Sequence, residues 1–443
     1  MHTVVTTEGR SETRALERVT IYHWLVVIIA SCGWLFDCMD QRLFILARES
    51  ALKELLRNDT QALAVLSTYI GYATTSMIVG WATGGIIFGV MSDKVGRVKT
   101  MVATLIVYAG FTGLSGLAHT WTEFTIYRFL VGLGIGGMFG AATALVAESV
   151  PTHFRAVALG LLQALSALGN IVGSLVTLWV PPGTEGFLGS YAGWRVLFFI
   201  GILPALLIAP IVFVLKEPAS WLQARAEAAA GHARKSVGSP ADLFRDPRWR
   251  RNTIVGLFLG VSGMIGLWGI GFFSPELISR ALAGAPQTVV DHVRGWGTAL
   301  QDVGSFVGML VFTYVAARAS RRLAFFGALL LSMLVTMFVF NSLQTATDAY
   351  WMLPMMGFAQ LAVFAGYSIY FPELFPTRLR GTGVGFCYNT VRYLAAPAPI
   401  LLGYLATLMS FRSAAILMST VYLLGIVALW WAPETKGQPL PED

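Results

Sequence analysis

Five charged side chains stand inside apolar stretches of the chain, where a charge is costly unless it has a partner or a function. Asp37 and Asp40 are three residues apart, so they share roughly one face of a helix. The other three are Arg128, Asp302 and Arg392. A carboxyl group that gains and loses an arginine partner can release and bind a proton, and a guanidinium can bind both oxygens of a carboxylate. These residue types indicate proton exchange and anion binding.

The composition is that of a membrane protein. Of the 443 residues, 56% are hydrophobic and 12% are charged, whereas a soluble domain carries about 25% charged residues. The three cysteines form no C-x-x-C pair, and the six histidines lie in tails, loops or at span edges without an H-E-x-x-H pattern. We therefore predict no metal, no cofactor and no enzymatic activity.

Twelve stretches are long and apolar enough to cross a bilayer as helices, since backbone amides in hydrocarbon must bond within their own segment. They are centred near residues 31, 79, 108, 135, 168, 205, 264, 305, 332, 360, 394 and 422. This predicts an all-α membrane protein whose parts are an N-terminal tail (1–20), a six-helix bundle (21–216), a linker (217–251), a second six-helix bundle (252–433) and a C-terminal tail (434–443).

Basic residues predict the orientation. Most of the 31 lysines and arginines lie in the tails and in the loops on the same side as the tails, which predicts cytoplasmic termini and insertion in the inner (plasma) membrane. The net charge of +7 reflects this bias, so no nucleic-acid partner is expected. The linker 217–251 is either a helix on the membrane surface or a solvated connection, and both interpretations stay open.

The two halves share motifs, which indicates an internal repeat. The pattern E-x-x-P-x-x-x-R follows span four and recurs 225 residues later, after span ten. Two further pairs occur in the same order. The paired segments are residues 148–155 with 373–380, 89–99 with 313–323, and 216–218 with 433–437.

These motifs resemble those of the major facilitator superfamily. The pattern G-x-x-x-D-[KR]-x-G-R-[KR] is met from Gly89 to Arg97, with Lys99 one place late, and R-x-x-x-G-x-G-x-G is met by residues 128–136. The resemblance implies two pseudo-symmetric six-helix bundles that rock about a central site at mid-membrane, exposing it alternately to each side.

The motif charges predict a cytoplasmic latch that closes when the helix ends meet. Its first-half members are Asp93, Arg97, Glu148 and Arg155. Its second-half members are Arg321, Glu373 and Arg380, and this half should latch less firmly because Ala317 and Ser320 replace the acid and the glycine of the pattern. The alternative is that these charges merely orient loops, because surface ion pairs contribute only about 0–1 kcal/mol each.

The proton site follows from the resemblance to proton-coupled sugar porters and aromatic-acid symporters. In those proteins the last acid of the first-span motif carries the proton and the fourth-span arginine is its partner. The corresponding residues here are Asp40 and Arg128, with Asp37 as a second acid. A static ion pair that only neutralises buried charge is the alternative.

The substrate site follows from residues 380–397, which resemble span eleven of organic-anion, nicotinate and aromatic-acid carriers. The resemblance implies that Arg392 faces the cavity and meets an anion, with Asp302 holding it when the site is empty. A purely structural Asp302–Arg392 pair is the alternative. Candidate apolar walls are Trp34, Trp268, Phe272, Phe273, Tyr367 and Tyr388.

A sugar or polyol is the competing substrate. Residues 433–437 and 217–222 look like sugar-porter signatures, and Gln163 stands where sugar porters bind hydroxyls, but span seven lacks their amide side chains. Residues 169–174 lack the proline typical of antiporters, which favours symport. We therefore expect a monomeric proton-coupled symporter of a monocarboxylate or aromatic acid, whose partners are the small-molecule substrate, protons and the lipid bilayer. A sensor or scaffold that no longer transports is disfavoured by the intact motifs.

Overall fold

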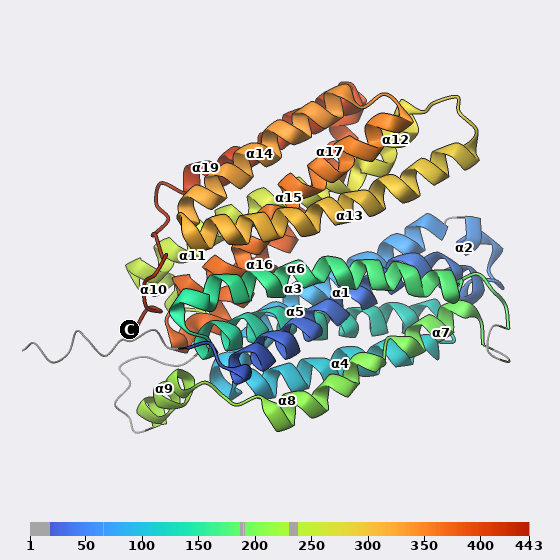
Figure 1. The fold of residues 1–443 in the computed structure, drawn as a ribbon. Helices are drawn as coiled ribbons and strands as arrows, with labels where there is room; N and C mark the ends of the chain where they lie inside the picture. Colours follow the sequence, from blue (N-terminus) through green and yellow to red (C-terminus); the bar gives the residue numbers. More distant parts are fainter. Residues whose placement is uncertain (1–17, 65, 187–188, 190, 230–237, 443) are drawn as a thin grey trace, which may run out of the picture.

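The computed structural model describes residues 18–442 apart from 65, 187–188, 190 and 230–237, and this part of the chain is helical throughout its regular structure. Two groups of helices lie side by side, the N-terminal group coloured blue to green and the C-terminal group yellow to red (Figure 1). The first group contains α1 Ile21–Leu55, α2 Thr60–Ala64, α3 Leu66–Val95, α4 Arg97–Gly116, α5 Trp121–Ser149, α6 Thr152–Trp179, α7 Gly193–Ile200 and α8 Ile208–Val214.

The linker contributes two short helices, α9 Ala219–Ala229 and α10 Asp242–Arg245. The second group then begins with a helix that is interrupted by a π turn at residues 265–270 and a 3₁₀ turn at 271–273. Its members are α11 Pro247–Met264, α12 Ser274–Ala281, α13 Gln287–Arg318, α14 Arg321–Ser342, α15 Ala346–Leu374, α16 Arg380–Ala395, α17 Ala398–Leu408, α18 Phe411–Ser419 and α19 Tyr422–Ala428.

Eleven helices in the described part are long and apolar enough to cross a membrane. The stretch expected near residue 394 is instead divided, because α16 ends at Ala395 and α17 begins at Ala398, after Pro397. Proline has no N–H to donate and its ring disturbs the preceding turn. The α16 segment also carries Arg380 and Arg392, which lower its hydropathy. It is therefore a short, polar helix placed between the two bundles.

Glycines allow close helix contact inside the first bundle. A Cβ atom added to Gly84 of α3 would lie 1.9 Å from the Leu133 carbonyl oxygen, and one added to Gly136 of α5 would lie 2.0 Å from that of Trp81. Small residues at such crossings let backbones approach closely in a membrane. The glycines after Arg128 therefore pack α5 against α3 and α4, which keeps α5 rigid.

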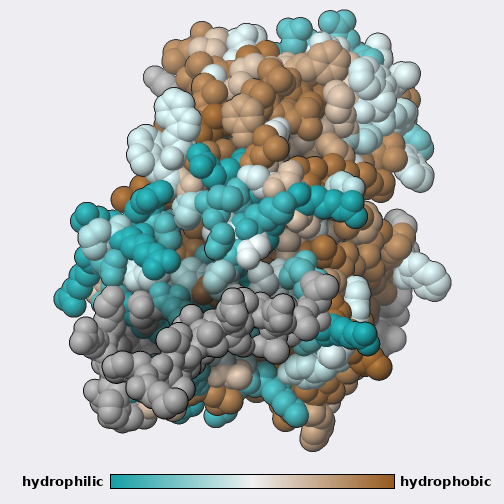
Figure 2. Space-filling model, turned by 60° about the vertical axis from the view of Figure 1, so that its left-hand side comes forward, coloured by the Kyte–Doolittle hydropathy of each residue, from teal (hydrophilic) through white to brown (hydrophobic). Residues whose placement is uncertain are grey.

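The end of the bundles that carries α9, α10 and residues 434–442 is called the linker end below, and the opposite end, with α2, α7 and α12, the far end (Figure 1). Figure 2 turns the linker end forward and shows hydrophilic side chains gathered between apolar flanks. The linker is attached here to both bundles. The Trp221 indole N–H donates to the Asp93 carbonyl oxygen at 2.7 Å, and Arg378 pairs with Asp242 at 2.7 Å.

Candidate functional site

A cavity of about 330 Å³ lies between the two bundles. Its walls come from α1, α3 and α6 on one side and from the α11–α12 turn, α13, α15 and α16 on the other. Six of the residues predicted to form the substrate and coupling sites line it: Trp34, Gln163, Trp268, Asp302, Tyr388 and Arg392. The helix repeat thus brings together side chains that are far apart in sequence.

Helix α1 turns one face to the cavity and keeps its two predicted acids off that face. Trp34, Cys38, Arg42 and Ile45 line the cavity, at the spacing of one helical face. Asp37 and Asp40 lie among the buried side chains instead and do not line this cavity. The two acids therefore face the interior of the first bundle, behind the cavity wall that α1 forms.

Asp40 and Arg128 are neighbours, as the resemblance implied. A guanidinium nitrogen of Arg128 lies 3.8 Å from a carboxylate oxygen of Asp40, and both side chains are fully buried. Arg128 also donates to the Ser115 hydroxyl at 2.6 and 3.1 Å and stacks over the Phe198 ring at 4.6 Å. Neither Asp40 oxygen has a hydrogen-bond partner within the described chain. The pair is long and loosely held, and it lies outside the cavity.

Arg392 projects from α16 into the cavity with its side chain 5% exposed. It donates to the Tyr388 carbonyl oxygen at 2.9 Å and to the Asn389 amide oxygen at 2.7 Å. Its guanidinium lies 3.9 Å from the centre of the Trp81 ring and 4.6 Å from that of Tyr388. Its Nε makes no hydrogen bond, and no carboxylate of the described residues forms an ion pair with it. A buried cation is left with aromatic neighbours and an unused donor.

The predicted Asp302–Arg392 pair is wrong for this conformation, because Asp302 of α13 pairs with Arg42 of α1 at 2.9 Å. Each side chain of that pair is 26% exposed. The reason is geometric: α1 and α13 face each other across the cavity, while Arg392 is held by carbonyl and amide oxygens of its own helix. The sequence contained a signal for Arg42, a charge within span one.

The predicted aromatic walls divide into two groups. Tyr388 stacks on Phe139 with ring centres 3.9 Å apart, and Trp34 meets Tyr388 edge to face at 6.3 Å, so both form cavity wall. Tyr367 does not: it is buried and its hydroxyl donates to the Leu259 carbonyl oxygen at 2.6 Å. Phe273 packs against Phe411. The Phe272 side chain lies outside the described part of the chain.

The sequence analysis missed other cavity residues that carry no charge and no motif. Trp81 of α3 is one, and polar residues supplied by α1, α6, α12 and α13 are among the others: Gln41, Asn170, Ser274 and Gln301. Only knowledge of which helix face meets the cavity would have found them. The Gln163 amide oxygen is buried without a hydrogen-bond partner in the described structure.

The linker end is closed by an ion-pair network. Arg97 binds Asp93 at 2.8 Å and Glu148 at 2.9 Å, and all three side chains are fully buried. Asp93 also accepts from the backbone N–H groups of Gly381 at 2.9 Å and Thr382 at 2.7 Å, at the start of α16. The first-half motif therefore holds the second bundle.

The predicted division of the latch into two separate halves is wrong, because two arginines are exchanged between bundles. Arg380 of the second bundle pairs with Glu148, and Arg155 of the first lies 4.0 Å from Glu373, which Arg321 binds at 3.0 Å. Each of these arginines is also held by its own bundle. The Nε of Arg155 donates to the Ala147 carbonyl oxygen, and that of Arg380 donates to the Pro372 carbonyl oxygen. The outer nitrogens of both guanidinium groups therefore point across the interface.

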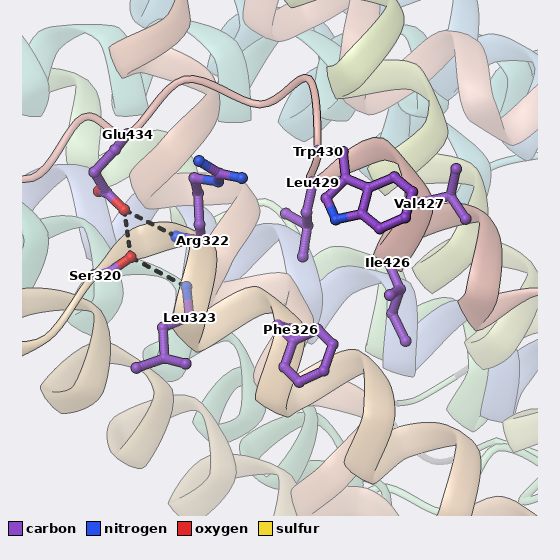
Figure 3. A pocket seen from close by; sticks show the side chains of 9 residues that line it. All are labelled: Ser320, Arg322, Leu323, Phe326, Ile426, Val427, Leu429, Trp430 and Glu434. Atoms are coloured by element: carbon purple, nitrogen blue, oxygen red, sulfur yellow. Dashed lines mark hydrogen bonds between the residues drawn. The ribbon is translucent and has the colours of Figure 1, made fainter.

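A carboxylate from the chain segment after each bundle caps an earlier helix of that bundle, α4 in the first and α14 in the second. Glu217 accepts from the N–H groups of Arg97 at 2.7 Å and Val98 at 3.0 Å. Glu434 accepts from the Ser320 hydroxyl and from the N–H group of Arg322 (Figure 3). It also accepts from the N–H group of Arg321 at 3.1 Å. Burial alone would raise the pKa of Glu434, but these hydrogen bonds outweigh it and lower the pKa below its usual 4.5.

Two bundles of apolar helices around a central cavity, closed at one end by a breakable charge network, define a secondary transporter. The comparison of sequences agrees, since residues 32–398 match the Major Facilitator Superfamily. The chain belongs to this superfamily, whose members are transporters and not enzymes.

Similar proteins of known name support the same class. The chain is 29% identical over 364 residues to the cis,cis-muconate transport protein of Acinetobacter baylyi, covering 82% of this chain and 84% of that one. It is 25% identical over 426 residues to the benzoate transport protein of the same organism, covering 88% and 85%. The fold is similar to that of the proton:xylose symporter XylE, with a TM-score of 0.77 at 19% identity over 95% and 98% of the two chains.

Proposed function

We propose that this transporter carries a small organic anion with a carboxylate group, in symport with a proton. The observation that carries the proposal is Arg392, a buried guanidinium in the cavity that has an unused Nε donor and no acidic partner among the described residues. An uncompensated buried charge is strongly unfavourable. A carboxylate substrate would supply the missing negative charge and a planar, two-point contact.

The other walls suit an acid with an apolar body. Trp34, Trp81 and Tyr388 surround the approach to the guanidinium, and aromatic rings bury a large apolar surface. The relatives named for muconate and benzoate transport point to the same chemical class. The amide side chains of the cavity, Gln41, Gln163 and Gln301, would serve hydroxyl groups of a sugar, so hexose is the competitor that the test must include.

The proton proposal rests on charge balance in the first bundle. Asp37 and Asp40 are both buried within one turn of α1, and Arg128 is the cation that pairs with Asp40. Neither oxygen of Asp37 has a hydrogen-bond partner in the described chain. Two buried carboxylates beside one guanidinium would leave one negative charge unbalanced, so we infer that one carboxyl binds a proton in this conformation.

We also propose that the linker end faces the cytoplasm and that the protein lies in the inner membrane. The linker end contains most of the lysines and arginines outside the helices, and such residues stay on the cytoplasmic side during insertion. The conformation with an intact latch would then be closed to the cytoplasm.

The test is uptake into proteoliposomes that contain the purified protein. Labelled benzoate, muconate and hexoses are compared with and without an inward proton gradient, for the wild type and for Arg392→Lys. Gradient-driven accumulation of a carboxylate is expected, with affinity at least tenfold weaker in the lysine variant because the planar contact is lost. Accumulation of hexose but no acid, or an Arg392→Lys variant with unchanged affinity, would overturn the proposal.

A further inference from the structure

A second pocket lies on the outer side of Arg392, between α3 and α16. It has a volume of about 290 Å³ and shares three residues with the central cavity, Trp81, Trp268 and Arg392. Its remaining lining is Thr75, Ile78, Val79, Tyr393, Ala395 and Ala396. The guanidinium of Arg392 therefore borders two spaces, one lined by polar groups and one almost entirely apolar.

The pocket lies next to the close contact between α3 and α16. Nearer the linker end they are in glycine contact: a Cβ atom on Gly385 would lie 2.3 Å from the Gly85 carbonyl oxygen, and one on Gly89 2.8 Å from that of Gly381. Farther along, the Thr83 and Tyr393 hydroxyls bond each other across the interface at 2.6 Å. Tyr393 of this bond also lines the pocket, together with Thr75, Ile78 and Val79 of α3.

The outer wall of the pocket faces the bilayer. Val79 is 38% and Tyr393 is 41% exposed, and both belong to helices at the surface between the bundles. The side chain of Trp81, by contrast, is buried and lies over the guanidinium on the inner side. The pocket is thus a side chamber that joins the site of the anion to the apolar surroundings of the helices.

We propose that this pocket is the subsite for the apolar part of the substrate, and that the transported class is amphipathic carboxylates with a hydrophobic group of several carbons. The proposal rests on the function proposed above. The carboxylate would meet Arg392 from the central cavity, and the hydrocarbon would extend past the guanidinium into the space between α3 and α16. The pocket would then select for chain length, and Arg392 for charge.

The arrangement gives a quantitative expectation. Each methylene group transferred from water to an apolar site gains about 0.8 kcal/mol, which corresponds to about a fourfold increase in affinity. Straight-chain carboxylates from acetate to octanoate should therefore bind with affinity that rises about fourfold per methylene until the pocket is full.

The experiment measures the ratio of octanoate to acetate affinity by calorimetry on the protein in nanodiscs. Val79→Trp fills the pocket from α3, and Ala396→Trp fills it from α16, so two independent variants probe the same space. Ile87→Trp is the matched control, because it adds the same bulk to α3 at a residue that is 50% exposed and does not line the pocket. The ratio should fall at least tenfold in both pocket variants and stay unchanged in Ile87→Trp.

The two proposals fail in different ways. The subsite proposal is overturned if the octanoate-to-acetate ratio is equal in the wild type and the pocket variants. It is also overturned if wild-type affinity does not depend on chain length, which is expected if a lipid chain occupies the pocket. Either result leaves the proposed carboxylate transport intact. Absence of binding for every carboxylate, together with hexose accumulation in proteoliposomes, overturns the proposed function and the subsite with it.

Discussion

Asp40 lies beside Arg128 but behind the cavity wall, so in the mechanism that we propose its charge would act on the substrate through the position of α1 and not by contact. The 3.8 Å separation and the two unbonded carboxylate oxygens leave room for the pair to tighten or to part as α1 moves. A carboxyl group responds to either change by losing or gaining a proton. The residue is thus placed to sense the conformation of the bundle.

Replacement of Asp40 by Asn removes the titrating group and keeps its shape. We expect gradient-driven accumulation to be lost in proteoliposomes, because no proton is carried, while exchange of labelled for unlabelled substrate continues. Asp37→Asn is the matched comparison on the same face of α1. Accumulation that persists in Asp40→Asn and disappears in Asp37→Asn would transfer the proton to Asp37.

The Arg42–Asp302 pair joins the two bundles inside the cavity, and each partner is partly exposed. Arg42→Ala and Asp302→Ala should each reduce transport, because the remaining charge stands alone in the cavity. Residues in direct contact show interaction energies of about 0.5–3 kcal/mol in double-mutant cycles. The double variant should therefore lose less substrate affinity than the sum of the single variants, measured by calorimetry. Additive losses would show that the two side chains act independently.

The sequence was sufficient for the identity of the charged residues and for two of their pairs, but not for the partners of Asp302, Arg155 and Arg380. Asp40 and Arg128, and Asp93 with Arg97, were predicted because motifs fix their position on helices that meet in this fold. Arg42 was assigned no role. Only the rotation of α1 about its axis shows that Arg42 faces the cavity, whereas Asp40, two residues earlier, does not. Pairing depends on that rotation, which a single sequence does not give.

At the scale of elements, the tail after α19 acts as a cap for α14. The Glu434 carboxylate occupies the N-terminus of α14, where backbone N–H groups lack partners within the helix. Thr435 continues the contact by donating to Glu373 at 2.6 Å, and Lys436 donates to the Arg318 carbonyl oxygen at 2.6 Å. The tail therefore connects the helix start to the latch.

The lowered pKa of Glu434 predicts how this contact depends on pH. A group whose folded-state pKa lies below its unfolded value stabilises the folded state above the unfolded pKa, and the contribution is lost as the pH falls through the folded pKa. The protection of the amide hydrogens at the first turn of α14, measured relative to the intrinsic exchange rate at each pH, should therefore be high at neutral pH and fall below about pH 4.5, the usual pKa of glutamate.

Two variants isolate this carboxylate. Glu434→Gln should show low protection at the first turn of α14 at every pH, while Glu442→Gln in the same tail should behave like the wild type. Protection that is equally high in Glu434→Gln and in the wild type would show that the cap is not what protects these N–H groups.

The fold, like the charged site, could be predicted from the sequence only in part: the regular helices could, and their interruptions could not. The helices of the two bundles follow from apolar stretches and from caps such as Thr120 and Thr345, which are readable in the sequence. The break at Pro397 was not expected, because the spans were assigned by hydropathy and not by the position of proline. The π turn at residues 265–270 was not expected either, because it packs against α17 and α18, which a single sequence does not show. Irregular backbone is tolerated at membrane depth only where protein or a cavity surrounds it.

At the scale of the whole molecule, the latch makes closure of the linker end a property of both bundles together. Glu148 of the first bundle binds Arg97 of the first and Arg380 of the second, and Glu373 of the second contacts Arg155 of the first. Because these charges are buried, removal of one partner leaves the others unpaired away from water, which costs far more than the loss of a surface pair. Opening must therefore break the network as a unit.

Glu148→Gln should shift the protein toward the conformation open at the linker end, because two buried arginines lose their shared carboxylate. Cys38 lines the cavity and reports access to it, once Cys32 and Cys387 are replaced by serine. In the protein with these two serine replacements and an intact latch, an impermeant maleimide should label Cys38 from the far-end side. In Glu148→Gln, labelling from that side should slow at least tenfold and labelling from the linker side should appear, since alternating access closes one end as the other opens.

Glu49→Gln is the matched control, an exposed acid paired with Lys53 outside the latch. Equal labelling in Glu148→Gln and Glu49→Gln would mean that the conformational equilibrium is set elsewhere, and the exchanged arginines would then be packing contacts with no control over access.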